Sequence, residues 1–151
     1  MYQKILVPLD GSSEAERVIG LAQNELAENG ALILLQVIAP AKNQRIGEHV
    51  ILSTQQEEAD RAAALDYLKS VAQHQSVQPA QLLFEVAISN SVAEEIVNVA
   101  RREQVDLVAM YTHDRRGLAK MIKGSIAQKV KDISPVEVKA FPSRELEPVG
   151  S

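Results

Sequence analysis

The residues best suited to chemistry lie in residues 106–125, DLVAMYTHDRRGLAKMIKGS, where an apolar run leads into a basic, glycine-containing loop. The loop ends in Gly124 and Ser125, at the start of a predicted helix. The basic side chains of this loop are those of Arg115, Arg116, Lys120 and Lys123. The first N–H groups of a helix lack partners inside the helix and carry a partial positive charge. The pattern therefore predicts an anion site at this helix start.

Metal binding and catalysis have little support in the rest of the sequence. There are no cysteines, and the three histidines, His49, His74 and His113, are not spaced as zinc ligands usually are. The glycine motifs GxxxxGK(S/T) and GxGxxG are both absent. The acidic residues that could hold Mg²⁺ between phosphates are Asp10 and Asp114, and no nucleophile accompanies His113. We therefore expect no resident metal and no catalytic residues.

The composition is that of one globular domain. With 151 residues, 46% of them hydrophobic, the chain is long enough for one buried core and too short for two ordinary domains. A net charge of −4 and an aromatic content of 3% argue against nucleic acid as a partner. There is no apolar run of membrane-spanning length and no secretory leader pattern. We expect a cytoplasmic protein that binds neither nucleic acid nor membrane.

Five short apolar runs are predicted to be strands. Three of them contain ILVPL, LILLQVI and LVAM, which are almost continuously apolar. Such runs are typical of parallel strands that helices cover on both faces. The predicted strands are residues 4–9, 31–38, 82–88, 106–111 and 136–141.

Four amphipathic segments alternate with these strands, and each opens with a capping-box pattern. The paired residues are Ser13 with Glu16, Thr54 with Glu57, Ser91 with Glu94, and Ser125 with Gln128. The first helix is predicted to end before Asn29 and Gly30. The second helix is predicted to bury a stripe formed by Ala62, Leu65, Leu68 and Ala72.

The remaining segments set the limits of the domain. Residues 39–53 are predicted to be a long mobile loop. Residues 1–142 form the predicted domain, and residues 143–151 have too little apolar content to fold, so we expect a disordered tail.

The order of the elements predicts a single-domain, doubly wound α/β fold of the Rossmann-like kind. Right-handed crossovers would give a five-stranded, mainly parallel sheet in the order 3-2-1-4-5, with four helices. In such sheets ligands bind beyond the carboxyl ends of the strands, where the winding reverses. That crevice lies between the first and fourth strands, so it brings residues 8–13 beside residues 111–125.

The sequence resembles the universal stress protein family over nearly its whole length. The resemblance rests on the opening KILVPLDGS, the strand ending VDLVAM and the segment HDRRGLAKMIKGSIAQKV. In the ATP-binding branch of that family, the last region reads as Gly, two residues, Gly, nine residues, and then Gly-Ser or Gly-Thr. Here Gly124 and Ser125 match the end of the pattern, whereas Tyr111 and Asp114 occupy the two earlier glycine positions.

The resemblance implies a nucleotide site in the crevice. By resemblance, adenine and ribose would face Pro8, Leu9 and Asp10, the base would border Val37, and phosphate would lie at Gly124, Ser125 and Ile126; Met110, Tyr111, His113 and Asp114 complete the expected set. The implied cofactor is ATP or another adenine nucleotide, with Mg²⁺ bound only together with the nucleotide.

Tyr111 and Asp114 change the chemistry of the implied site. Glycine at these positions would let the backbone approach the ligand without an intervening Cβ. A carboxylate about 5 Å from a phosphate costs about 1–3 kcal/mol at effective dielectrics of about 80 to 20. That is a loss of roughly 5- to 150-fold in affinity, which the basic residues of the loop could offset. The Tyr111 ring could fill the ribose pocket or turn outward.

Three functions are compatible with the sequence. The first is a homodimeric regulatory protein of the stress response, which binds an adenine nucleotide or another small anion and signals to an unknown partner protein. The second is a slow ATP hydrolase or phosphotransferase, for which the sequence shows no catalytic arrangement. The third is an interaction protein whose pocket is closed by Tyr111.

The last predicted strand is expected to form the homodimer. It would be an edge strand, and its alternating side chains suit antiparallel pairing with a second copy. The expected interface consists of Val136, Glu137, Val138, Lys139, Ala140 and Phe141, with Glu137 and Lys139 paired across the twofold axis.

Overall fold

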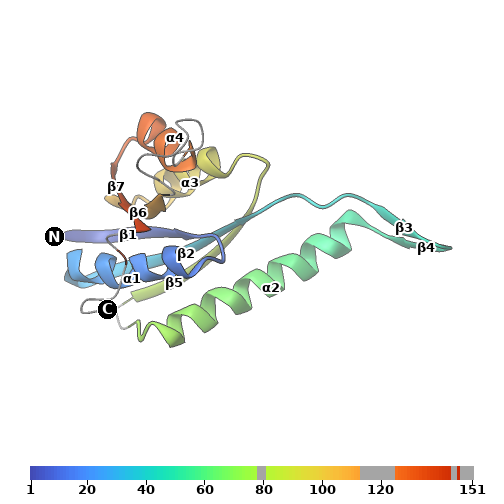
Figure 1. Ribbon diagram of the computed structural model, residues 1–151, viewed down its shortest axis with the longest axis horizontal. Coiled ribbons are helices and arrows are strands. Elements are labelled where there is room, and N and C mark those ends of the chain that lie inside the picture. The colour runs from blue at the N-terminus through green and yellow to red at the C-terminus, as the bar shows by residue number, and fades with distance from the viewer. Residues whose placement is uncertain (78–80, 113–124, 144–145, 147–151) are drawn as a thin grey trace.

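A five-stranded sheet with helices on both faces forms the body of the molecule (Figure 1). The computed structural model describes residues 1–77, 81–112, 125–143 and 146. In chain order the elements are β1 (Tyr2–Leu9), α1 (Ser13–Glu25), β2 (Leu26–Ile38), β3 (Gln44–Ile46), β4 (His49–Ile51), α2 (Ser53–His74), β5 (Gln81–Ile88), α3 (Val92–Arg102), β6 (Leu107–Thr112), α4 (Ser125–Ile133) and β7 (Glu137–Pro142).

The strand order of the sheet is β5-β2-β1-β6-β7, and all four strand pairs are parallel. In the numbering of the five predicted strands this is the order 3-2-1-4-5, so the predicted α/β fold is confirmed. Helices α1 and α2 pack on one face and helices α3 and α4 on the other. The winding therefore reverses between β1 and β6, where the sequence placed the crevice.

The two hydrophobic clusters explain the continuously apolar strands. In β1, Ile5 and Val7 belong to the cluster under α1 and α2, whereas Leu6 belongs to the cluster under α3 and α4. In β2, Leu34 and Leu35 divide between the two clusters in the same way. Successive side chains of a strand point to opposite faces, so a strand covered on both faces buries every residue.

Part of the predicted loop at residues 39–53 is instead an antiparallel hairpin of β3 and β4. Ile46 pairs with His49, which leaves a two-residue turn of Gly47 and Glu48. Gly47 has a φ of +62°, which is the conformation that the first turn residue of a type II′ hairpin requires. The prediction of an irregular loop is therefore wrong for the hairpin residues.

The helix boundaries differ from the predictions in ways that the capping contacts explain. Helix α1 is capped by Ser12, whose Oγ accepts the N–H of Ala15 at 3.2 Å, and not by Ser13. Helix α1 ends at Glu25, and the predicted end at residues 29–30 falls inside β2. At α2 the side chain of Gln55 accepts the N–H of Leu52 at 3.2 Å, so the Thr54 cap is wrong.

Two further details concern the second helix and the tail. The buried residues of α2 are Ala64, Leu68, Val71 and Ala72, whereas the predicted stripe residue Ala62 is exposed. Leu146, in the segment expected to be a disordered tail, is buried in the cluster under α1 and α2. Arg17 donates to its carbonyl oxygen at 3.2 Å, so this residue packs on the domain.

Candidate functional site

Strands β1 and β6 separate toward their carboxyl ends. Their described pairing is confined to Ile5 with Leu107 and Leu6 with Val108. Beyond these pairs β1 stays bonded to β2, and β6 to β7, to the ends of the strands. The described β1–β6 ladder thus stops before the carboxyl ends of both strands, where the winding of the sheet reverses, and we call this place the opening. This is the position at which doubly wound folds bind ligands.

The opposite end of the same strand pair is closed by Asp106. Its carboxylate accepts the N–H of Gln3 and the N–H of Lys4, each at 2.9 Å. Its own N–H donates to the carbonyl oxygen of Lys4 at 2.9 Å. Strands β1 and β6 are therefore fastened at the amino end and open at the carboxyl end.

The turn after β1 holds Asp10 at the mouth of this opening. Asp10 Oδ1 accepts the N–H of Ser12 at 2.9 Å and its hydroxyl at 2.5 Å, which is an Asx turn. Gly11 between them has a φ of +88°, a left-handed conformation that a side chain would strain. Because Ser12 also caps α1, the orientation of Asp10 is fixed by the start of that helix. Asp10 is exposed, so its carboxylate can reach a ligand.

Tyr67 of α2 lies beside this turn, and the sequence analysis did not identify it. Its hydroxyl donates to Glu16 Oε2 at 2.8 Å and so ties α2 to the first turn of α1. Burial raises the pKa of Tyr67, the bond to Glu16 raises it further, and the Gly11 backbone and the Asp10 carboxylate also influence it. The phenol therefore stays neutral and works as a hydrogen-bond donor. The sequence signal that could have found it is its place one residue before Leu68, on the buried side of α2.

The predicted residues at the ends of β2 and β6 lie on both sides of the sheet. Met110 is 5% exposed and belongs to the cluster under α3 and α4, and the partly buried Val37 packs against the same cluster. Tyr111 is half-buried and packs against the cluster under α1 and α2. Leu9 is buried in that same cluster, whereas Pro8 is half-buried. The ring of Tyr111 is therefore packed against the body and does not extend into solvent.

Helix α4 begins at Ser125, which is exposed, and Ile126 beside it is 44% exposed. Three other predicted site residues, His113, Asp114 and Gly124, lie outside the residues that the structure describes. The basic residues of the loop, Arg115, Arg116, Lys120 and Lys123, also lie outside them.

Within the described ranges, no three His, Cys, Asp or Glu side chains are grouped so that they could hold a metal ion. In the same part of the chain, no helix is long and apolar enough to cross a membrane.

Strand β7 is an edge of the sheet, as predicted, but its charged side chains have partners in their own chain. Tyr2 donates to Glu137 Oε1 at 2.6 Å, and Lys139 Nζ lies 3.1 Å from Glu25 Oε2 and 5.3 Å from the centre of the Tyr2 ring. The bond to Glu25 raises the pKa of Lys139, and the bond to Glu137 raises the pKa of Tyr2. A pairing of Glu137 with Lys139 across a twofold axis would have to compete with these contacts.

The other predicted interface residues of this strand face the core or its rim. Val136, Val138 and Ala140 pack against the cluster under α3 and α4, and Phe141 against the opposite cluster. The side chains thus alternate as predicted, which leaves the backbone as the part of β7 that is able to pair with another strand.

Comparison with known proteins identifies the family to which this fold belongs. The model of the universal stress protein family matches residues 1–141. The chain is 28% identical over 134 residues to universal stress protein MJ0531 of Methanocaldococcus jannaschii, a match that covers 86% of this chain and 76% of the relative.

Two similar solved structures contain adenine nucleotides. A universal stress protein in complex with cAMP has a TM-score of 0.65 at 20% identity, with 94% of this chain and 98% of the other covered. The universal stress protein of Archaeoglobus fulgidus in complex with dAMP has a TM-score of 0.59 at 20% identity, with 92% and 97% covered. At 20% identity, this similarity shows that the chain has the same fold as those two proteins.

Proposed function

Because this chain belongs to the universal stress protein family, we propose that it binds an adenine nucleotide in the opening between β1 and β6 and acts as a regulatory binding protein. The observation that carries the proposal is the separation of these strands beyond Ile5 and Leu6. Two structural relatives hold cAMP and dAMP, so an adenine nucleotide is the ligand class that the likeness favours.

The side chains around the opening suit a nucleoside. Asp10 is exposed and oriented by Ser12, and a carboxylate in such a position accepts hydrogen bonds from ribose hydroxyls. Val37 near the end of β2 is partly buried, and its apolar side chain suits the edge of a base. Helix α4 begins at Ser125, and the first N–H groups of a helix, which lack partners within the helix, are of the kind that bind phosphate. ATP or a shorter adenine nucleotide would be the ligand, with Mg²⁺ entering only alongside it.

The proposed protein is a homodimer that pairs through the edge strand β7 and passes its nucleotide state to a partner protein in the stress response. An exposed parallel edge invites pairing with a second copy. The other edge, β5, is partly guarded, because Arg61 donates to the carbonyl oxygen of Val86 on that strand at 2.8 Å. This contrast favours β7 as the dimer strand. The proposed setting is the cytoplasm.

One observation favours the interaction protein without nucleotide as a second candidate. The Tyr111 ring, at the end of β6, is partly buried against the cluster under α1 and α2, and it adds an aromatic side chain next to the opening. In that case the protein would bind a partner protein and would not bind a nucleotide.

Ligand analysis separates the two candidates. Freshly purified protein would be denatured and its released small molecules identified by mass spectrometry, and calorimetry would then measure the binding of ATP, AMP and cAMP. We expect saturable binding that Asp10→Ala weakens at least 10-fold, about 1.4 kcal/mol. Asp66→Ala, which removes an exposed aspartate from α2, is the matched control and should bind as the wild type does. The proposal would be contradicted if the purified protein released no nucleotide and gave no heat of binding with about 1 mM nucleotide, a concentration well above the Kd of typical specific binding.

A further inference from the structure

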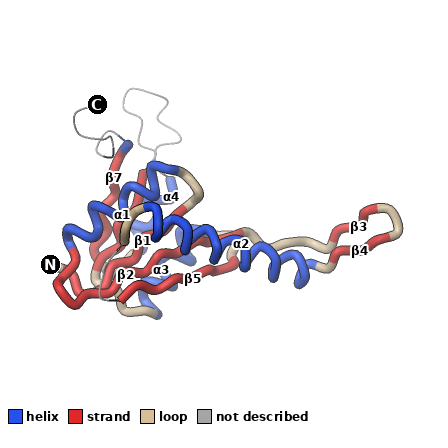
Figure 2. Tube along the Cα trace, turned by 90° about the horizontal axis from the view of Figure 1, so that it is seen from below, coloured by secondary structure: helices blue, strands red, loops and turns tan. Residues whose placement is uncertain are grey.

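The β3–β4 hairpin projects from the body of the protein. Figures 1 and 2 show it beyond the start of α2, at the end of the molecule opposite the N-terminus. We call residues 42–52 the arm. At its base the N–H of Ala41 donates to Glu57 Oε2 at 3.0 Å, and the N–H of Ser53 donates to Asn43 Oδ1 at 2.6 Å. The arm is therefore fastened to the first turn of α2 and holds a defined direction.

The arm exposes large apolar side chains on both of its faces. Ile46 is 61% exposed, Val50 52% and Leu52 47%. Cross-strand neighbours share a face, so Ile46 and His49 lie on one side and Arg45 and Val50 on the other. A two-stranded hairpin this short is marginal alone in water and gains stability from further strands or from a packing partner. The arm would therefore be stabilised by additional strands that pair with it and cover its apolar side chains.

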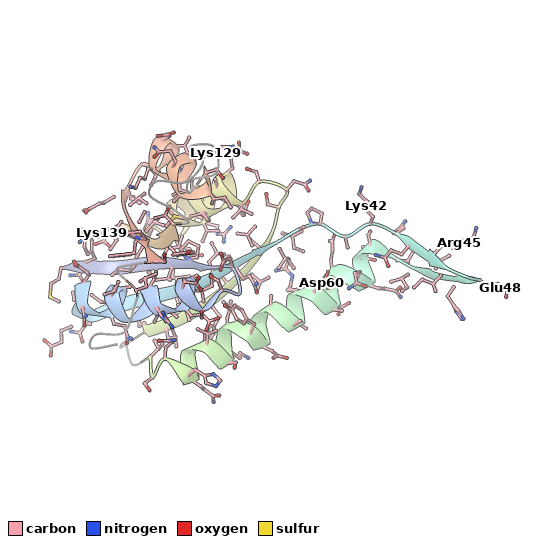
Figure 3. The ribbon with its side chains drawn as sticks, in the orientation of Figure 1. Lys42, Arg45, Glu48, Asp60, Lys129 and Lys139 are labelled. Carbon is pink, nitrogen blue, oxygen red and sulfur yellow. The ribbon has the colours of Figure 1, made fainter. Side chains whose placement is uncertain are left out.

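The two edges of the arm differ in charge. The edge strand β3 contains Arg45, a charge of the kind that discourages strand pairing. Strand β4, His49–Ile51, contains no lysine, arginine, aspartate, glutamate or proline. Figure 3 labels three charged side chains of the arm, Lys42, Arg45 and Glu48, and none of them belongs to β4. The edge free for pairing is therefore β4.

We propose that β4 pairs antiparallel with β4 of a second copy of this chain, with Val50 at the twofold axis. In this register Val50 faces Val50 of the partner subunit, and His49 faces the partner's Ile51. The result is a four-stranded sheet in the order β3-β4-β4-β3. One of its faces would gather Ile46, which is exposed in the single chain, and Ile51, which is partly buried there, from both copies.

Charge and shape are compatible with a second copy. The two Arg45 side chains would lie on the outer strands, three strand spacings or about 14 Å apart. That separation exceeds the Debye length of about 8 Å at physiological salt, so their repulsion would be weak. Figure 2 shows that the arm extends away from the five-stranded sheet, so two arms paired antiparallel would hold their sheets on opposite sides of the contact. The contact is smaller than a standard interface, so the association should depend on protein concentration in the micromolar range.

Cross-linking tests the register directly. The chain has no cysteine, so Val50→Cys introduces a single thiol at the proposed axis. Directly opposed residues of an antiparallel pair have Cα atoms about 4.5–5.5 Å apart, within the range that a disulfide bridges. Mild oxidation should convert most of this variant to a covalent dimer. Ile133→Cys, at an exposed apolar residue of α4, is the matched control and should remain largely uncoupled.

Sedimentation equilibrium tests the association without a cross-link and separates it from the proposed β7 dimer. Val50→Lys should lower the average mass that the wild type reaches at high concentration, whereas Ile133→Lys should leave it unchanged. Mixing Val50→Lys with Val50→Glu should restore the mass, because opposite charges would then meet at the axis. Val138→Pro removes a backbone donor from β7, so association that persists in this variant belongs to the arm.

Each outcome decides the inference. A wild-type mass that Val50→Lys does not change, or a Val138→Pro variant that stays monomeric at about 100 μM, well above the concentrations at which micromolar interfaces form, would overturn it. A Val50→Cys variant that cross-links no better than Ile133→Cys would also overturn it. None of these results depends on nucleotide binding, so the proposed function could stand or fall separately.

Discussion

Replacing Asp106 by alanine should destabilise the protein without weakening ligand binding at the proposed site. The Asp106 carboxylate accepts two backbone N–H groups from Gln3 and Lys4 at 2.9 Å each. Hydrogen bonds to a charged group are worth about 1.5–3 kcal/mol each. Asp106 is exposed, so water competes for both donors. We therefore expect Asp106→Ala to lower the free energy of unfolding by about 1–2 kcal/mol in total.

Urea unfolding followed by circular dichroism measures this loss. For a chain of this length, 1 kcal/mol corresponds to about 2–4 °C in Tm, so the variant should melt roughly 2–8 °C lower. Asp106→Asn keeps one acceptor oxygen, so its free energy of unfolding should lie between those of the wild type and Asp106→Ala. Asp66→Ala, on an exposed face of α2, is the control and should change the free energy by less than about 0.5 kcal/mol.

The same variants test whether the two ends of the β1–β6 pair act independently. Asp106 lies at the amino end, and the proposed site lies at the carboxyl end. Nucleotide affinity should therefore change less than about threefold in Asp106→Ala while stability falls. A variant as stable as the wild type would show that Asp106 does not fasten the strands. A collapse of affinity in a folded variant would show that the opening depends on the amino end.

Three further predictions concern the site and the edge. Tyr67→Phe removes the bond to Glu16 and should cost about 1 kcal/mol of stability at pH 7. The pKa of Tyr67 in the folded protein lies above its unfolded value near 10, so its contribution to stability is complete below pH 10 and is lost as the pH rises through the folded pKa. In urea titrations at several pH values, the wild type should therefore lose stability above pH 10 more steeply than Tyr67→Phe. Tyr111→Gly combined with Asp114→Gly should tighten ATP by roughly 10-fold, with the aspartate's share shrinking at high salt in calorimetry; unchanged binding would mean that these residues belong to the site. Val138→Pro should abolish the β7 dimer in sedimentation equilibrium, and an unchanged mass would place that dimer elsewhere.

The fold could be predicted from the sequence because its central strands carry a strong signal. Residues such as Ile5, Leu6 and Val7 are apolar without interruption, and burial on both faces of the sheet explains this run. The position of the opening followed from the strand order and needed no side-chain detail. A long element with many buried residues is easier to predict, because each of its apolar residues indicates the same secondary structure and the same burial.

Short elements and single contacts were not predictable in the same way. The hairpin of β3 and β4 has three residues in each strand, which is too few for its alternation to stand out. Ser12 and Ser13 are both good caps, and only the bond from Ala15 to Ser12 decides between them. Tyr67 meets Glu16 across 51 positions of sequence, so the contact exists only once α2 packs beside α1.

Hydrogen–deuterium exchange with and without AMP or ATP tests the central claim most directly. If an adenine nucleotide enters the opening, the amides of residues 7–12 and 109–112 should exchange more slowly with ligand, whereas the arm and the amino end of the sheet should not change. Asp10→Ala should lose this protection at a nucleotide concentration that saturates the wild type. Protection that appears elsewhere in the chain, or exchange that nucleotide leaves unchanged throughout, would contradict the account.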